Sequence, residues 1–207
     1  MTALQTSARS GLAGLFGRLR GRPAGAERYP ASLFAMYQVD DRDRVIELND
    51  VPQSSVGAPL PVVLSDEHTL LLAYLVQEPT SSWDHMSVRL VGPDTLIERL
   101  ALVEFSRYQS FMFGSPNDEA FNGHPLYSRG LHPYAAFEIQ NSSWVRQLER
   151  MNSVHPSHRA ERFQRLKHFV FAFHDSTFEC LAETYVISDH EGSLELLLPE
   201  MQRRLRW

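Results

Sequence analysis

Two histidines and two glutamates near the carboxyl end are the residues best suited to chemistry. His168 and His174 bound the alternating stretch HFVFAFH, and Glu179 and Glu183 follow soon after. Imidazole is the side chain whose unperturbed pKa lies near neutral pH, and a carboxylate can orient it or balance its charge. We therefore treat all four as candidate catalytic residues, with His174 as the proton carrier.

Three phenylalanines determine how these residues are oriented. Because side chains alternate along a strand, Phe169, Phe171 and Phe173 share one face, and three rings on one face should be buried. His168 and His174 then lie on the opposite face. Val170, Ala172 and Leu181 are expected on this histidine face too, which favours some cover over it.

A tight turn after this strand would bring the acids to the histidines. A two-residue turn at Asp175-Ser176 pairs position 168 with 183 and position 172 with 179. His168 would then lie opposite Glu183, and His174 diagonal to Glu179. We favour this hairpin.

A helix is the rival interpretation of the same residues. Ser176-x-x-Glu179 is a capping box, and Phe178, Leu181 and Tyr185 have helical spacing. A helix here would remove the pairing between the acids and the histidines.

The histidine face permits three uses. His168, His174 and Glu179 could hold a divalent metal as a two-histidine, one-carboxylate site, which suits Zn, Fe or Mn. The face could instead line a pocket for binding or acid–base work. It could also be a solvated sheet face on which histidine and glutamate form surface pairs.

The segment Gly114–Pro133 is long and aperiodic, which is typical of functional or disordered loops. Its apolar residues Phe121, Leu126 and Leu131 favour a packed loop. Its polar residues are candidate ligand contacts, joined by one residue just before the loop: Asp118, Asn122, His124, Arg129 and Tyr108. Arg129 could neutralise an anionic substrate.

The elements that must position these residues are mostly strands. Short β-type runs alternate with turn clusters, which predicts an α+β fold: a β-rich antiparallel barrel or sandwich-like sheet with one or two short helices. The runs are Leu33–Gln38, Arg44–Leu48, Leu60–Leu64, Thr69–Gln77, Ser87–Val91, Leu100–Arg107, Tyr134–Gln140 and Lys167–His174.

Two helices are expected. Ser142 or Ser143 can cap one in which Trp144, Leu148 and Met151 recur at the helical spacing i, i+4, i+7. Towards the end of the chain, Ser193–Leu198 could be a last strand, hairpinned through DHEG, before a short basic helix that starts at Pro199.

Charge divides the chain into a lead and a body. Residues 1–28 read as a disordered or weakly amphipathic basic lead, and 29–207 as a single globular β-rich domain. Four arginines and no acid give residues 1–26 a charge of +4. Because the net charge of the chain is −5, the remaining residues carry −9. An acidic body argues against general nucleic-acid binding.

The composition limits the class of protein to which the chain can belong. Hydrophobic residues at 43% and charged residues at 22% are ordinary globular values. A single cysteine excludes an internal disulfide and a CxxC zinc site. No apolar run is long enough for a transmembrane segment, so a soluble, cytoplasmic protein is expected. The P-loop, GxGxxG, GxSxG, HExxH and EF-hand patterns are not found.

Two functions fit these features. The first is a small-molecule-binding domain or enzyme that uses a His/Glu pocket for acid–base or metal-assisted chemistry, with the pocket between the histidine face and the long loop. The second is a non-catalytic protein-interaction or oligomeric structural domain, possibly a homo-oligomer. In that case Leu205 and Trp207, if exposed, would anchor the interface.

Overall fold

The computed structural model describes residues 37–78 and 90–205. The chain divides into two units, Met1–Pro30 and Ala31–Trp207, and every described residue belongs to the second. The basic lead, the domain boundary after it and Trp207 lie outside the described residues. So do most of the expected strands Leu33–Gln38 and Ser87–Val91.

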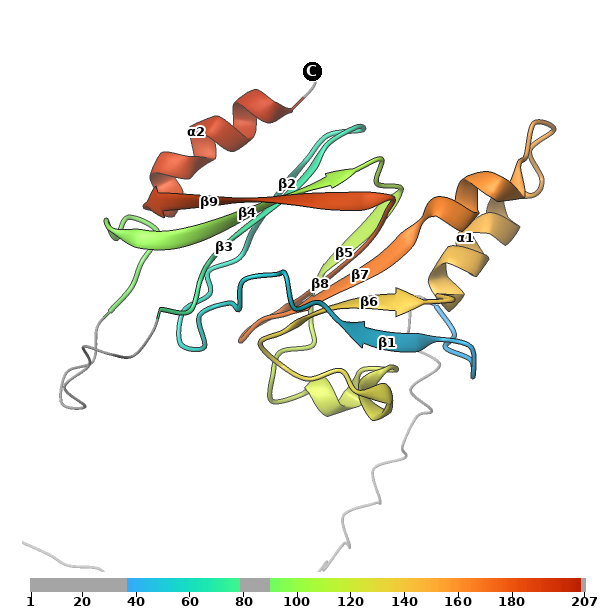
Figure 1. The fold of residues 1–207 in the computed structure, drawn as a ribbon, viewed down its shortest axis with the longest axis horizontal. Helices are drawn as coiled ribbons and strands as arrows, with labels where there is room; N and C mark the ends of the chain where they lie inside the picture. Colours follow the sequence, from blue (N-terminus) through green and yellow to red (C-terminus); the bar gives the residue numbers. More distant parts are fainter. Residues whose placement is uncertain (1–36, 79–89, 206–207) are drawn as a thin grey trace, which may run out of the picture. The chain divides into compact units, whose positions relative to one another are not determined.

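The described residues form two antiparallel sheets (Figure 1). The first sheet has the order β1 (Arg44–Glu47), β6 (Ala136–Gln140), β7 (Lys167–Ala172), β8 (Thr177–Ala182), β5 (Ser110–Gly114). The second has the order β2 (Val62–Ser65), β3 (Leu70–Leu75), β4 (Glu98–Ser106), β9 (Thr184–Gly192). The β-rich antiparallel α+β prediction is confirmed. The two sheets are separate and open, so of the two architectures the sandwich is correct.

Aromatic rings fill the space between the sheets. Phe169, Phe171 and Phe173 all lie in this core, as their alternation predicts, and Phe105 of β4 packs against them from the other sheet. The run LLLAYL of β3 does not alternate because both its faces are buried, one in this core and the other under a helix.

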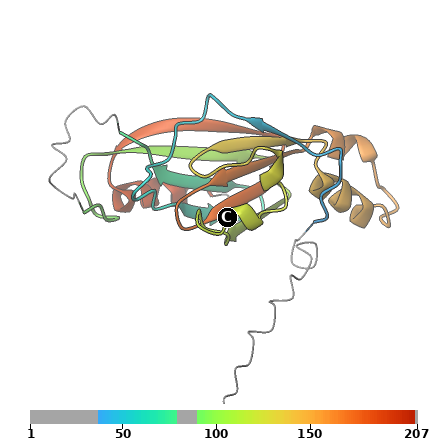
Figure 2. The same ribbon diagram turned by 90° about the horizontal axis from the view of Figure 1, so that it is seen from below.

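The outer face of each sheet is also covered. Helix α2 (Leu194–Arg204) packs on the second sheet through Leu194, Leu197 and Met201 (Figure 1). On the first sheet, α1 (Ser143–Asn152) and the long loop bury the histidine face under Trp144, Phe121 and other apolar side chains. The loop carries two 3₁₀ turns, η2 (Phe121–Gly123) and η3 (Tyr127–Arg129). A third, η4 (Ala160–Arg165), follows α1, and Figure 2 shows α1 and this region at one end of the sheets.

The first expected helix is confirmed and the second is misplaced. Ser142 caps α1, its Oγ accepting hydrogen bonds from the backbone N–H groups of Trp144 and Val145. At the end of the chain, however, β9 continues through DHEG, and α2 begins at Leu194 with Ser193 as its cap. The spacing of the apolar residues in α2 is helical, and this outweighs the proline inside it.

The end of α2 bears on the interaction hypothesis. Leu205 is buried against the second sheet, so it is not an exposed anchor. Among the described residues, no helix has the length and apolar character needed to cross a membrane.

Candidate functional site

The structure separates the four histidine and glutamate candidates. Strands β7 and β8 form the expected hairpin, and residues 176–187 are not helical, but the turn is His174-Asp175, one residue earlier than expected. His168 therefore pairs with Leu181, not with Glu183. Because the turn comes one residue earlier, each residue of β7 pairs two positions earlier in β8 than expected. A shift of two positions leaves every side chain on its expected face, so the faces are correct although the register is not.

His168 and Glu179 join a buried hydrogen-bonded network that sequence reasoning did not assemble. They lie diagonally on neighbouring strands, with His168 Nε2 at 2.8 Å from Glu179 Oε2. The same Oε2 accepts a hydrogen bond from Tyr37 Oη at 2.6 Å, and His124 Nε2 lies 3.2 Å from Oε1. The side chain of His168 is 0% exposed, and that of Glu179 is 10% exposed.

Every polar atom of the two imidazoles is already engaged. The backbone N–H of Leu126 donates to His124 Nδ1 at 3.2 Å, so the proton of that ring is on Nε2, where it is donated to Glu179. Ser142 Oγ lies 3.0 Å from His168 Nδ1. Because Oγ already accepts two backbone hydrogen bonds, its own O–H is free to donate to Nδ1. No imidazole lone pair remains for a substrate or a metal.

The charge of Glu179 is stabilised inside this network. Burial by itself would raise the pKa of Glu179, but the hydrogen bonds from His124 and His168 outweigh it and hold the pKa well below its ordinary value. A carboxylate with hydrogen-bond partners on both of its oxygens links β8, β7 and the long loop. The network therefore stabilises the packing of the long loop on β7 and β8.

The proposed metal triad is not assembled. His174 lies in the turn, beyond the last paired residues of the hairpin, whereas His168 and Glu179 are inside the sheet. Within residues 37–78 and 90–205, no three His, Cys, Asp or Glu side chains are grouped to hold a metal ion. The described structure therefore does not bring His168, His174 and Glu179 together as a set of metal ligands. Between the histidine face and the loop, where the pocket was expected, the loop's apolar side chains pack directly on that face.

His174 has a different acidic partner, Asp118 from the long loop. His174 Nδ1 lies 2.8 Å from Asp118 Oδ2, and Tyr134 Oη hydrogen-bonds the same carboxylate oxygen. The hydrogen bond from Tyr134 lowers the pKa of Asp118, and His174 lowers it further. Burial and the bond to Asp118 raise the pKa of Tyr134 to about 12, so its phenol stays protonated. The side chain of His174 is 41% exposed, which leaves this imidazole within reach of solvent.

The other loop candidates are dispersed. Arg129 Nη1 donates to the backbone carbonyl of Asp43 at 2.8 Å and so anchors the loop. Asn122 is exposed in η2. His124 belongs to the buried network. Tyr108 lies elsewhere, in a cleft that Glu183 also lines.

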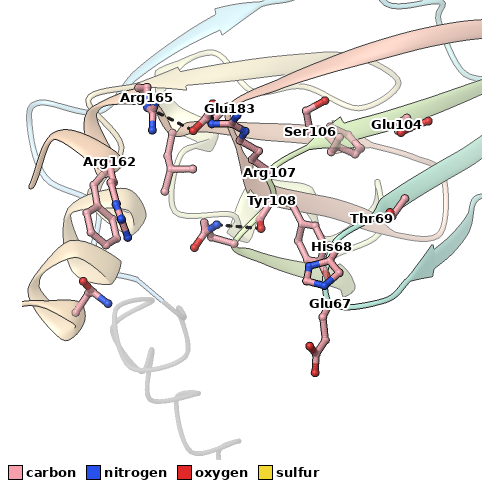
Figure 3. A pocket seen from close by; sticks show the side chains of 15 residues that line it. Glu67, His68, Thr69, Glu104, Ser106, Arg107, Tyr108, Arg162, Arg165 and Glu183 are labelled. Atoms are coloured by element: carbon pink, nitrogen blue, oxygen red, sulfur yellow. Dashed lines mark hydrogen bonds and ion pairs between the residues drawn. The ribbon is translucent and has the colours of Figure 1, made fainter. Parts of the chain in front are cut away.

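Tyr108 and Glu183 line an open cleft of about 600 Å³, which we call the arginine cleft (Figure 3). Its walls come from the β2–β3 turn, the end of β4 and the residues after it, η4, and the link between β8 and β9. The lining residues are Glu67, His68, Thr69, Glu104, Phe105, Ser106, Arg107, Tyr108, Gln109, Asn152, Arg162, Phe163, Arg165, Leu166 and Glu183.

The arginine cleft is lined by three arginines and three glutamates, and these acids engage the guanidinium groups only in part. Glu183 is shared by two arginines, with Arg107 Nη1 at 3.6 Å and Arg165 Nε at 3.4 Å from its oxygens. Glu104 is engaged by Arg204, outside the cleft. Within the described residues, the guanidinium of Arg162 has no hydrogen bond and no ion pair. Several guanidinium N–H groups therefore remain available to an anion.

The arginines of η4 are the functional candidates that sequence reasoning missed. Arg159, Arg162 and Arg165 recur every third residue in RAERFQR. A 3₁₀ helix has three residues per turn, so Arg162 and Arg165 inside η4 lie on the same side. The spacing was visible in the sequence, but it indicates a shared face only once the 3₁₀ geometry is known.

Comparison with protein-family models, with curated proteins and with solved structures gives no match. The function of this chain must therefore be argued from its own geometry.

Proposed function

We propose that the protein is a small-molecule-binding domain that holds an anionic ligand in the arginine cleft. The observation that carries the proposal is the pair Arg162 and Arg165, which stand on one side of η4 with guanidinium N–H groups unused by the described residues. Guanidinium groups bind carboxylate and phosphate through paired N–H donors, and such charge-assisted bonds are the strong ones.

The rest of the arginine cleft favours a ligand with an apolar part as well as a charge. Phe163 and Tyr108 contribute aromatic surface on two sides of the cleft. A volume of about 600 Å³ is in the range of sites for metabolite-sized ligands. The ligand class is therefore a carboxylate or phosphate ester that carries a ring or a short apolar chain.

A fluorescent aromatic sulfonate, 8-anilinonaphthalene-1-sulfonate, tests this proposal, with citrate and AMP as competitors. We expect saturable binding of one dye per chain that weakens as salt is raised. Arg162→Glu should weaken binding at least about tenfold, because it replaces a charge-assisted donor with a repelling charge.

Arg44→Glu is the matched control for this experiment. Arg44 is an exposed arginine of β1 outside the arginine cleft, and its replacement changes the net charge by the same amount. Equal weakening by the two variants would mean that only net charge matters, and it would contradict the proposal. So would the absence of saturable binding.

The paired His174 and Asp118 support a second candidate function, acid–base chemistry. A carboxylate on Nδ1 holds that proton in place and leaves Nε2 as the base, the arrangement that general-base histidines use. Its exposure keeps Nε2 accessible, unlike the buried His168.

The reactivity of His174 with diethyl pyrocarbonate measures this directly. Asp118→Asn should slow modification of His174 about threefold or more, because a neutral amide on Nδ1 stabilises less well the positive charge that develops on the ring as Nε2 attacks the reagent. His155, an exposed histidine without a carboxylate partner among the described residues, is the internal reference in the same digest. An unchanged ratio of the two modification rates would remove this candidate.

A further inference from the structure

A projecting segment lies at the end of the sheets where α1 and η4 meet (Figure 2). Its turns are closed by backbone hydrogen bonds, from His155 N to the carbonyl of Asn152 and from His158 N to that of His155, both 2.9 Å long. Residues 150–157 are all exposed. We call residues 150–162 the basic tip, and its exposure leaves it open to a partner.

Charge is divided unevenly between this end of the domain and the rest of the chain. Residues 144–167 hold six basic residues and two acids, which is a charge of +4 in a chain whose net charge is −5, with histidine counted as neutral. Among the described residues, the side chains of Arg150, Arg159 and Arg162 form no ion pair. The basic tip is therefore complementary to an acidic surface.

Two apolar side chains accompany the arginines of the basic tip. Val154 is 88% exposed and Met151 is 65% exposed, so most of each side chain is in water. An acidic protein or a nucleic acid offers charge to the arginines but needs no apolar group at the tip. An anionic membrane offers both, because charged headgroups lie at its surface and acyl chains lie directly beneath them.

The N-terminal sequence combines the same two features. Residues 9–22 contain four arginines and no acid, together with the apolar residues Leu12, Leu15, Phe16 and Leu19. Stable attachment to a membrane takes two signals, because one short apolar contact is weak by itself. Two separate basic and apolar segments in one chain therefore favour a lipid surface as the partner.

We propose that the basic tip docks on membranes that contain anionic lipid. Arg150, Arg159 and Arg162 bond the phosphates and carboxylates of the headgroups. Val154 and Met151 enter the boundary between the headgroups and the acyl chains. The proposal does not depend on the ligand of the arginine cleft, because Arg150, Arg159 and Val154 do not line that cleft.

Sedimentation with lipid vesicles measures the part that charge plays. We expect the protein to bind vesicles of equal parts phosphatidylcholine and phosphatidylserine, and not vesicles of phosphatidylcholine alone. Arg159→Gln should weaken binding about fivefold, the effect of one basic residue near an anionic surface. Arg99→Gln is the matched control. Arg99 is an exposed arginine of β4 outside the basic tip, so its replacement should change binding less than about twofold.

A fluorophore at position 154 measures insertion into the membrane. The only cysteine of the chain, Cys180, is buried, so Val154→Cys can be labelled selectively with a nitrobenzoxadiazole group, whose emission rises in an apolar medium. We expect this emission to rise when the labelled protein binds anionic vesicles. The same label in Val56→Cys, at an exposed valine outside the basic tip, should not respond.

The proposal is overturned if the protein does not sediment with anionic vesicles, or if it binds both kinds of vesicle equally. Equal weakening by Arg159→Gln and Arg99→Gln would overturn it too, since only net charge would then matter. A label at position 154 that does not respond on vesicle-bound protein would mean that another segment makes the contact, which also contradicts the proposal. Tighter binding to a single-stranded oligothymidylate than to the vesicles, with the same dependence on Arg159, would make nucleic acid the partner and would overturn the proposal as well.

Discussion

Replacing Glu179 with alanine should lower the free energy of unfolding by about 3–5 kcal/mol, the range for removing one partner of a buried charged network. The change leaves the hydroxyl of Tyr37 and the Nε2–H groups of His124 and His168 without their acceptor. Each buried donor left unpaired costs about 1–3 kcal/mol. Urea denaturation followed by circular dichroism measures the difference.

Glu183→Ala is the matched control for Glu179→Ala. Its carboxylate also contacts two basic groups, Arg107 and Arg165, but both arginines are more than half exposed. Exposed ion pairs contribute about 0–1 kcal/mol, so the loss should be small. If the two variants lose comparable amounts of unfolding free energy, Glu179 is not part of a buried network that stabilises the fold.

The same network predicts how stability depends on pH. The pKa of Glu179 is lower in the folded protein than its ordinary value of 4.5, because the hydrogen bonds from His124 and His168 outweigh burial. Such a carboxyl stabilises the fold above its unfolded pKa, and this stabilisation is lost as the pH falls below it. The gap in stability between the wild type and Glu179→Gln should therefore be widest near neutral pH and should narrow below about pH 4.5.

The second large effect is expected from Phe105→Ala. Phe105 is 1% exposed and is the ring of β4 that meets Phe169, Phe171 and Phe178 of the first sheet, with centroids 5.4–5.9 Å apart. Truncating a buried phenylalanine costs about 3–5 kcal/mol, because apolar contact is lost and a cavity remains. The loss is read from the midpoint of urea unfolding.

Phe113→Ala provides the comparison for Phe105→Ala. Phe113 lies on the edge strand β5 and is 44% exposed, so its truncation should cost less than about 1 kcal/mol. If both phenylalanines cost the same, the core does not lie between the two sheets as described.

The strands near His168 show what alternation can and cannot predict. Phe169, Phe171 and Phe173 point inward because burial requires it. The face on which Glu179 and Leu181 lie follows from the alternation of side chains along a strand. The register does not follow, because it depends on which residues turn. Here Asp118 N donates to the carbonyl of His174, and the carboxylate of Asp118 holds its ring, so His174 is fixed in the turn by a residue far away in the chain.

The buried network shows the same limit. The register of a hairpin that turns at Asp175-Ser176 predicted Glu183 as the partner of His168, but β8 ends at Ala182 and Glu183 lies where the chain passes to the other sheet. The actual acidic partner of His168 is Glu179. The other residues that bond Glu179, Tyr37 and His124, come from segments whose positions only the packed structure defines. Cover over the histidine face could be anticipated from Val170, Ala172 and Leu181. The residues that provide it could not.

The most direct test is to map where an anionic ligand binds. Backbone amide shifts of the ¹⁵N-labelled protein, followed during titration with 8-anilinonaphthalene-1-sulfonate, report the site. We expect the largest shifts at residues 106–109 and 162–166, on the two sides of the arginine cleft, and little change at His168 and Glu179. Shifts centred on His168 and Glu179 would mean that the buried network opens to ligands, which would contradict this account.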